Sequence, residues 1–216
     1  MSDNRSGRRR FLRSTAAAAI GITGGIAASG TAGAAPDTSN TDEIRVYSSG
    51  NYWEYQIHTE VGRDDLEKGN RANGHDKIRG WGDYADGKIY DGGVDNYWMD
   101  SDDWITQINV TYDDYGWLQI DIDSTSAGYA ALGIRRDGNP DYPGYDYTID
   151  IDGQIQPHHD YFDHGQDEIR NGDAGPFVGT VDPDDIDGVI RTGPPTHVFI
   201  EDPDSPGTGL TMDLPL

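Results

Sequence analysis

The stretch Trp117-Leu118-Gln119-Ile120-Asp121-Ile122-Asp123 places apolar and polar side chains in alternation. A period of two is typical of a β-strand with one face on a core and the other in solvent. The same alternation recurs in residues 53–59, 104–110 and 147–151, and turns rich in Gly, Asp, Asn and Pro separate the runs. No amphipathic helical pattern persists beyond about two turns. The sequence therefore predicts an all-β protein.

An internal repeat is visible when the chain is shifted by 92 residues against itself. The shift keeps the inward-facing apolar positions in register near both ends of the window, as a duplication does. A shift of 91 aligns Asp76 with Asp167. The pairs at 92 are Tyr55 with Tyr147, Ile57 with Ile149, Gly87 with Gly179, Asp95 with Asp187, Ile108 with Ile200, Leu118 with Leu210, Ile120 with Met212 and Ile122 with Leu214.

Each copy is small for an independent core, so we expect the two copies to pack as one antiparallel β-sandwich. Two separate small sandwiches are the alternative. The predicted boundaries are a signal peptide at 1–34, a polar linker at 35–43, a first copy at 44–124, a connection at 125–144 and a second copy at 145–216.

The first 34 residues have the form of a cleaved export signal, with a basic start, a mildly apolar middle and Ala32-Gly33-Ala34 at the end. The motif Arg8-Arg9-Arg10-Phe11-Leu12-Arg13 resembles a twin-arginine signal, which implies the twin-arginine export machinery as a partner. The apolar run is too short and too polar for a membrane span, and no cysteine offers a lipid anchor. We therefore expect an extracellular protein without a stable membrane anchor, either free or associated with the cell surface.

The charge is strongly negative. The net charge of −23 becomes −27 once the five Arg and one Asp of residues 1–34 are removed. Asp is spread evenly among apolar residues, which argues against a disordered acidic tail. Molar salt would screen the self-repulsion of such a surface, so the composition, which resembles that of proteins from extremely halophilic archaea, predicts a halophilic protein. A surface of this charge excludes nucleic acid as a partner.

The segment Gly92-Gly93-Val94-Asp95-Asn96-Tyr97-Trp98, with alternating strands on either side, resembles a repeated module of proteins secreted by halophilic archaea. Two departures are Trp98-Met99-Asp100, where that family has Phe-Ser-Gly, and Asp187-Gly188-Val189-Ile190, where the tyrosine is missing. The resemblance implies a β module without an assigned activity of its own. It transfers no catalytic residue.

Two kinds of metal site are candidates. The segment 157–164 gathers imidazoles and carboxylates, which suit Zn, Ni or Cu, and a plain polar loop is the alternative. Its candidate ligands are His158, His159, Asp160, Asp163 and His164. Calcium is the other cofactor considered, because the stretches 121–123, 150–153 and 182–188 place carboxylates near turns. Aspartate in turns is the alternative there.

Aromatic residues concentrate in the first copy, which holds all five Trp. Trp53 and Trp104 fit the apolar face of a strand and are predicted to be core. Exposed rings beside carboxylates are suited to stacking on sugars. The predicted ligand-binding residues, which lie in segments rich in Gly and Asp, are Trp81, Tyr84, Tyr115 and Trp117.

The sequence favours a secreted, non-catalytic binding or surface-interaction module, with extracellular or cell-surface polysaccharide as the candidate ligand. Two alternatives remain open: a small secreted hydrolase that uses Asp/Glu or the histidine cluster, and a structural protein of the cell envelope. No catalytic residue is assigned. Asn109, in Asn109-Val110-Thr111, is a candidate glycosylation site that the alternation places on the solvent face.

Overall fold

The computed structural model describes residues 41–59, 66–101, 103–112, 116–126, 129–137 and 142–215, apart from the side chains of residues 81, 123–126, 129 and 130. The predicted signal peptide at 1–34 and residues 35–40 of the predicted linker lie outside these ranges. No helix in the described ranges has the length and apolar character needed to cross a membrane.

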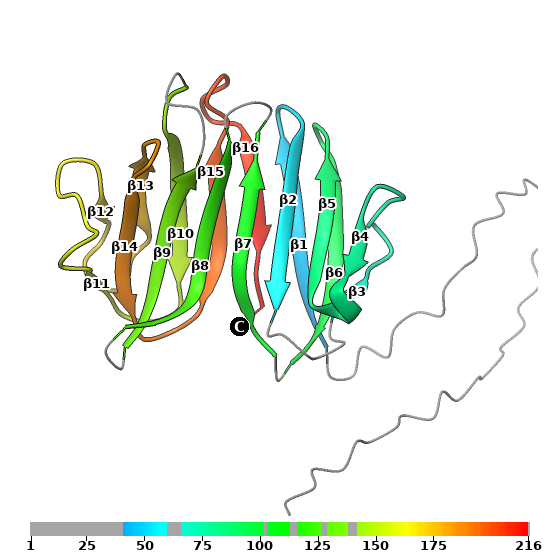
Figure 1. The fold of residues 1–216 in the computed structure, drawn as a ribbon, viewed down its shortest axis with the longest axis horizontal. Helices are drawn as coiled ribbons and strands as arrows, with labels where there is room; N and C mark the ends of the chain where they lie inside the picture. Colours follow the sequence, from blue (N-terminus) through cyan, green and yellow to red (C-terminus); the bar gives the residue numbers. More distant parts are fainter. Residues whose placement is uncertain are drawn as a thin grey trace, which may run out of the picture. The chain divides into compact units, whose positions relative to one another are not determined.

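The described chain is an antiparallel β-sandwich of two eight-stranded sheets, as predicted. Sheet A has the order β12-β13-β10-β15-β16-β1-β6-β3, and sheet B the order β11-β14-β9-β8-β7-β2-β5-β4. Figure 1 shows sheet B in front of sheet A. The 3₁₀ turn η2 (Gly80–Gly82) joins β4 to β5. The strands are β1 (Thr41–Ser49), β2 (Trp53–Thr59), β3 (Glu67–Lys68), β4 (Lys77–Arg79), β5 (Tyr84–Ile89), β6 (Val94–Asp100), β7 (Ile105–Thr111), β8 (Trp117–Ser126), β9 (Tyr129–Asp137), β10 (Tyr145–Ile151), β11 (Ile155–Pro157), β12 (Glu168–Ile169), β13 (Phe177–Val181), β14 (Ile186–Arg191), β15 (Pro195–Glu201) and β16 (Gly209–Asp213).

The sandwich is built from two related copies, β1–β8 and β9–β16, which exchange strands between the sheets. The first copy contributes β4, β5, β2, β7 and β8 to sheet B and β1, β6 and β3 to sheet A. The second copy contributes the equivalent five strands, β12, β13, β10, β15 and β16, to sheet A and the equivalent three, β9, β14 and β11, to sheet B. Sheet B read from β4 and sheet A read from β12 therefore contain equivalent strands in the same order. The pairings β1–β16 and β8–β9 join the copies into continuous sheets.

Two of the predicted boundaries are corrected by the structure. The predicted connection 125–144 contains β9, a central strand of sheet B that pairs with both β8 and β14. Its alternation was hidden because the third inward position after Leu132 and Ile134 is Arg136, which is buried and lies 5.2 Å from the ring centroid of Tyr145. The predicted linker 35–43 overlaps β1, which starts at Thr41.

The core lies between the sheets and consists of the alternating apolar positions. Trp53 is fully buried as predicted, with its ring centroid 4.9 Å from that of Tyr112. Trp104, predicted to be core, is 44% exposed. A β-bulge explains the difference: His58 pairs with Gln107 but Thr59 pairs with Ile105, so Thr106 is an extra residue in β7. Ile105 therefore faces the core instead, and Trp104 is left outside.

A buried tyrosine meets buried carboxylates in each half. In the first copy the hydroxyl of Tyr55 donates to Asp95 Oδ2 at 3.0 Å and lies 2.8 Å from the hydroxyl of Tyr97. In the second copy the hydroxyl of Tyr147 lies 3.0 Å from Asp187 Oδ2. The two tyrosine–aspartate units, Tyr55 with Asp95 and Tyr147 with Asp187, lie 92 residues apart. The two copies therefore share this buried contact as well as the sequence pattern.

The same units require glycine on the neighbouring strand. A Cβ added at Gly87 would lie 2.2 Å from Cζ of Tyr55, and one added at Gly179 would lie 2.4 Å from the hydroxyl of Tyr147. Both contacts are shorter than any Cβ tolerates, because the tyrosine rings cross directly over the glycine backbone. The glycines at this repeat position therefore make room for the buried tyrosines.

All four edge strands of the sandwich are short. β3 and β12, at the edges of sheet A, have two residues each, and β4 and β11, at the edges of sheet B, have three each. Short edges limit the backbone groups that another chain could pair with. Assembly of copies by edge-to-edge strand pairing is therefore disfavoured.

Candidate functional site

A cavity of about 570 Å³ opens at one end of the sandwich, between the two copies. It is lined by the turn from β6 to β7 and by the equivalent turn from β14 to β15, together with the ends of β1, β8 and β16. Met99 and Arg191, Ser101 and Gly193, and Ile122 and Leu214 are lining pairs that lie 92 residues apart. The cavity therefore lies on the axis of the internal duplication, where equivalent turns of the two copies face each other.

The cavity has an apolar floor. Met99, Ile105, Ile122 and Leu214 line it and are each at most 7% exposed. Its volume falls within the usual range of ligand pockets, about 300–1,000 Å³. An apolar floor of this kind accepts the carbon skeleton of a ligand.

The mouth of the cavity is aromatic and polar. Trp104 and the carboxylates of Asp42 and Asp103 lie on the side of the first copy. Arg191 lies on the side of the second copy, where its guanidinium donates to the carbonyl oxygens of Gly193, at 2.5 Å, and Ile122. In the second copy the bulge residue equivalent to Thr106 is Thr196, so the position of Trp104 corresponds to Pro194 and the ring breaks the symmetry of the cavity. A ring, hydrogen-bond acceptors and a cation thus surround one concave surface.

The four rings predicted to bind a ligand do not form one described surface. Tyr115 lies outside the described residues, as does the side chain of Trp81. Trp117 is 40% exposed at the start of β8. Tyr84 is half-buried on β5, with its ring stacked on that of His58 at a centroid distance of 4.9 Å.

The strand register shows that Tyr84 and Trp117 are far apart. Tyr84 on β5 pairs with His58 on β2, and His58 pairs with Gln107 on β7. Gln107 in turn pairs with Asp121 on β8, so Tyr84 lies level with Asp121. Trp117 lies four residues before Asp121 on the same strand. That offset corresponds to about 13 Å along the strands and about 14 Å across three strand spacings. The two side chains share the outer face of sheet B but lie three strands apart and toward opposite ends of the strands.

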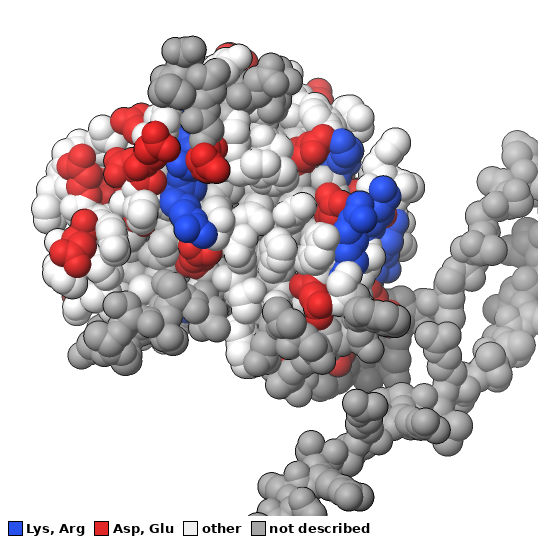
Figure 2. All heavy atoms as spheres, viewed as in Figure 1, with Lys and Arg blue, Asp and Glu red and all other residues white. Residues whose placement is uncertain are grey.

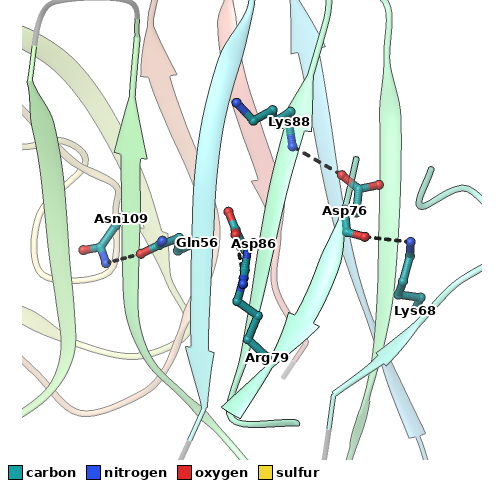
Figure 3. Close-up of polar contacts among 7 residues, drawn as sticks. All are labelled: Gln56, Lys68, Asp76, Arg79, Asp86, Lys88 and Asn109. Atoms are coloured by element: carbon teal, nitrogen blue, oxygen red, sulfur yellow. Dashed lines mark hydrogen bonds and ion pairs between the residues drawn. The ribbon is translucent and has the colours of Figure 1, made fainter. Parts of the chain in front are cut away.

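Side-chain amides occupy the middle of that face. Asn109 accepts from Nε2 of Gln107 at 2.7 Å, and its Nδ2 lies 3.3 Å from Oε1 of Gln56 and 3.2 Å from Nε2 of His58. Figure 3 shows Asn109 and Gln56 pointing toward each other, with the Arg79–Asp86 ion pair to one side. In Figure 2 an uncharged band separates two groups of charged side chains on this face. Asn109 faces solvent as predicted, and glycosylation there would require its amide nitrogen to leave both contacts.

The candidate histidine cluster is brought together in part. His158, His159 and Asp160 each place a ligand atom within 4.8 Å of the others. Asp163 accepts instead from the backbone N–H of Gly165 at 2.8 Å. The ring of His164 packs against Phe162, 4.9 Å between centroids.

Three aspartates of the stretches considered for calcium have other roles. Asp121 accepts from Nε2 of Gln119 at 2.6 Å and lies 3.6 Å from the guanidinium of Arg135. Asp184 adopts a positive φ of 65° in the turn before β14, and Asp187 lies in the core. These contacts are those expected of aspartates in turns, ion pairs and core bonds.

The acids with raised pKa values are not in the cavity. Burial, and secondarily the neighbouring Asp167, raises the pKa of Asp187 to about 7, and burial together with Asp76 raises that of Asp95 to about 6. Burial also raises the pKa of Asp167. Asp95 and Asp187 are each 2% exposed. Both carboxyls are therefore enclosed in the core, where each is hydrogen-bonded to a tyrosine hydroxyl.

The contacts of Tyr147 show why one of two neighbouring carboxyls in the core retains its proton. The hydroxyl of Tyr147 lies 3.0 Å from Asp167 Oδ1 and 3.0 Å from Asp187 Oδ2. A hydroxyl has one proton to donate, so it satisfies one of the two carboxylates. The second contact is favourable when the other carboxyl is protonated and donates to the hydroxyl oxygen. Sequence reasoning missed these acids as a unit, although the repeat alignment already paired their positions.

Comparisons with known proteins do not identify the chain: no family model, no curated protein and no solved structure matches it. The resemblance to modules of halophilic archaea therefore stays a hypothesis. Any functional proposal depends on the cavity and the surface described above.

Proposed function

We propose that the protein is a non-catalytic binding module for uncharged polysaccharide, with the cavity between the copies as its binding site. The single observation that carries the proposal is the place of Trp104: a large ring, 44% exposed, at the mouth of a cavity of about 570 Å³. Sugars bind to proteins by stacking their C–H faces on such rings. Their hydroxyl groups then bond to nearby polar side chains.

The polar groups at the mouth match this chemistry. The carboxylates of Asp42 and Asp103 accept hydrogen bonds from sugar hydroxyl groups, and the guanidinium of Arg191 is a donor. In molar salt the Debye length is about 3 Å, so only carboxylates in contact with the ligand discriminate by charge, and Asp42 and Asp103 at the mouth repel the anionic groups of uronates and sulfated glycans. The preferred ligand class is therefore neutral polysaccharide.

The hydrolase hypothesis gains no support from this geometry. Acid–base catalysis calls for a carboxyl with a shifted pKa that can reach the substrate. The described carboxyls with raised pKa, Asp95, Asp167 and Asp187, are buried and hydrogen-bonded to tyrosines away from the cavity. We therefore propose binding without catalysis.

Retention on insoluble polysaccharide in molar KCl tests the proposal, with cellulose, chitin and mannan as neutral probes and polygalacturonate as the anionic comparison. We expect retention on at least one neutral polymer and a loss of about tenfold or more in affinity for Trp104→Ala. Trp117→Ala is the matched control, because Trp117 is similarly exposed, at 40%, but does not line the cavity. Equal retention of both variants, or a preference for polygalacturonate, would count against the proposal.

The proposed setting is extracellular and highly saline, after export by the twin-arginine route. We expect the circular dichroism signal of the β-sheets to be lost as KCl falls below about 1 M, because the Debye length grows from about 3 Å at 1 M to about 10 Å at 0.1 M. Self-repulsion of the negative charges then destabilises the compact state. A thermal midpoint that is the same in dilute buffer and in molar KCl would refute the expectation.

A further inference from the structure

The turn after β11 is fixed to the neighbouring strand by its backbone. The N–H of His158 donates to the carbonyl of Gly188 at 3.2 Å, and the N–H of Gly188 donates to the carbonyl of Tyr161 at 2.6 Å. Within the turn, the N–H of Tyr161 donates to the carbonyl of His158 at 3.3 Å. Because β14 belongs to the body of sheet B, the turn is held on a rigid scaffold.

The side chains of this turn are packed in a stack. The ring of His158 lies between those of His159 and Tyr161, at centroid distances of 4.9 and 4.8 Å. His158 is 8% exposed, so its ring position is determined by these neighbours and by the strand beneath. The other two members of the cluster project into solvent, since the side chains of His159 and Asp160 are 79% and 61% exposed.

Two imidazoles and a carboxylate converge at this turn. Nε2 of His159 lies 3.0 Å from Oδ2 of Asp160, and the ligand atoms of all three residues lie within 4.8 Å of one another. Metal–nitrogen and metal–oxygen bonds of about 2.0–2.2 Å bring ligand atoms somewhat closer together than this. Rotation of the exposed side chains of His159 and Asp160 supplies that closure, while His158 remains the fixed ligand.

We propose that His158, His159 and Asp160 form a binding site for a divalent transition-metal ion, with Zn²⁺ or Ni²⁺ as the fitting class. Imidazole nitrogen favours these borderline ions over Mg²⁺ and Ca²⁺, which prefer sites made entirely of oxygen. Water completes the coordination on the exposed side.

Calorimetric titration of the full chain with Zn²⁺ tests the site, in molar KCl with excess Mg²⁺ to saturate weak binding to surface carboxylates. We expect one Zn²⁺ site, weakened about tenfold or more in both His158→Ala and His159→Ala. His164→Ala is the matched control and keeps wild-type affinity, because its ring packs on Phe162 outside the cluster.

A second readout separates loss of a ligand from loss of folding. Zn²⁺ raises the thermal midpoint of the wild type by mass action, and this rise is absent in His159→Ala, whose exposed side chain contributes little to the fold without metal. The proposal is overturned if no Zn²⁺ binding exceeds the Mg²⁺ background, or if His159→Ala binds as tightly as the wild type.

Discussion

Asp187→Asn is expected to raise the free energy of unfolding at about pH 8 and to flatten its dependence on pH. Burial raises the pKa of Asp187 to about 7, whereas an unfolded Asp titrates near 3.9. At about pH 8 the folded protein therefore contains an ionised carboxylate with little access to water. Raising the pKa of this carboxyl from about 4 to about 7 lowers the free energy of unfolding by at most about 4 kcal/mol once the group is ionised. The neutral amide of Asn avoids this destabilisation and still offers an acceptor to the hydroxyl of Tyr147.

The direction of the pH effect follows from the raised pKa. Between the unfolded value near 4 and the folded value of about 7, the folded state binds more protons than the unfolded state. The free energy of unfolding of the wild type therefore falls as pH rises through this window, and Asp95, with a pKa of about 6, adds to the trend. Glu43, whose pKa is lowered by its hydrogen bond with Arg45, acts in the opposite direction but only below this window.

Thermal unfolding from about pH 5 to pH 8 measures how the free energy of unfolding depends on pH. Molar KCl is used because it screens the general effect of the surface charge. Asp152→Asn is the matched control, because it removes the same charge from an exposed side chain. We expect Asp152→Asn to follow the wild type and Asp187→Asn to be more stable at the alkaline end. A less stable Asp187→Asn at about pH 8 would show that the buried carboxylate is favourable as an anion.

Gly179→Ala is expected to destabilise the fold by about 3 kcal/mol or more, because overpacking leaves no space for the new methyl group. Its Cβ would lie 2.2 Å from Oδ1 of Asp167 and 2.4 Å from the hydroxyl of Tyr147. Gly87→Ala meets Tyr55 in the same way and should have a comparable effect.

Gly133→Ala on β9 is the control, because no atom lies within 4 Å of its added Cβ. Chemical denaturation compares the three variants. We expect Gly133→Ala to stay within about 1 kcal/mol of the wild type. If Gly179→Ala and Gly87→Ala were as stable as Gly133→Ala, the buried tyrosines would be free to move aside, and the two units would not be fixed elements of the duplicated fold.

The fold class could be predicted because it depends on a local pattern. Alternation in residues 117–123 and 147–151 reports which side chains face the core, and the sandwich places them there. The pattern failed where a residue type contradicted its position. Buried Arg136 concealed β9, and the bulge at Thr106 moved Trp104 out of the core.

The candidate sites were harder to predict because they depend on contacts between distant segments. With 33 Asp in the chain, composition gives no sign that Asp95 and Asp187 differ from the rest. Only their shared position in the repeat marked them. The cavity is formed by turns 92 residues apart, so no single stretch of sequence contains it. The histidine cluster was recognisable because three of its five candidate residues are consecutive.

The location of glycan binding tests the central claim most directly. The chain has five Trp, whose indole N–H signals in a nuclear magnetic resonance spectrum report on five separate places, and the spectrum of Trp104→Ala assigns the signal of Trp104. The probe is a soluble oligosaccharide of the neutral polymer that retains the protein. We predict that its addition shifts the Trp104 signal and leaves those of buried Trp53 and distant Trp117 in place. A shift of the Trp117 signal with none at Trp104, or no shift of any indole signal, would contradict the account.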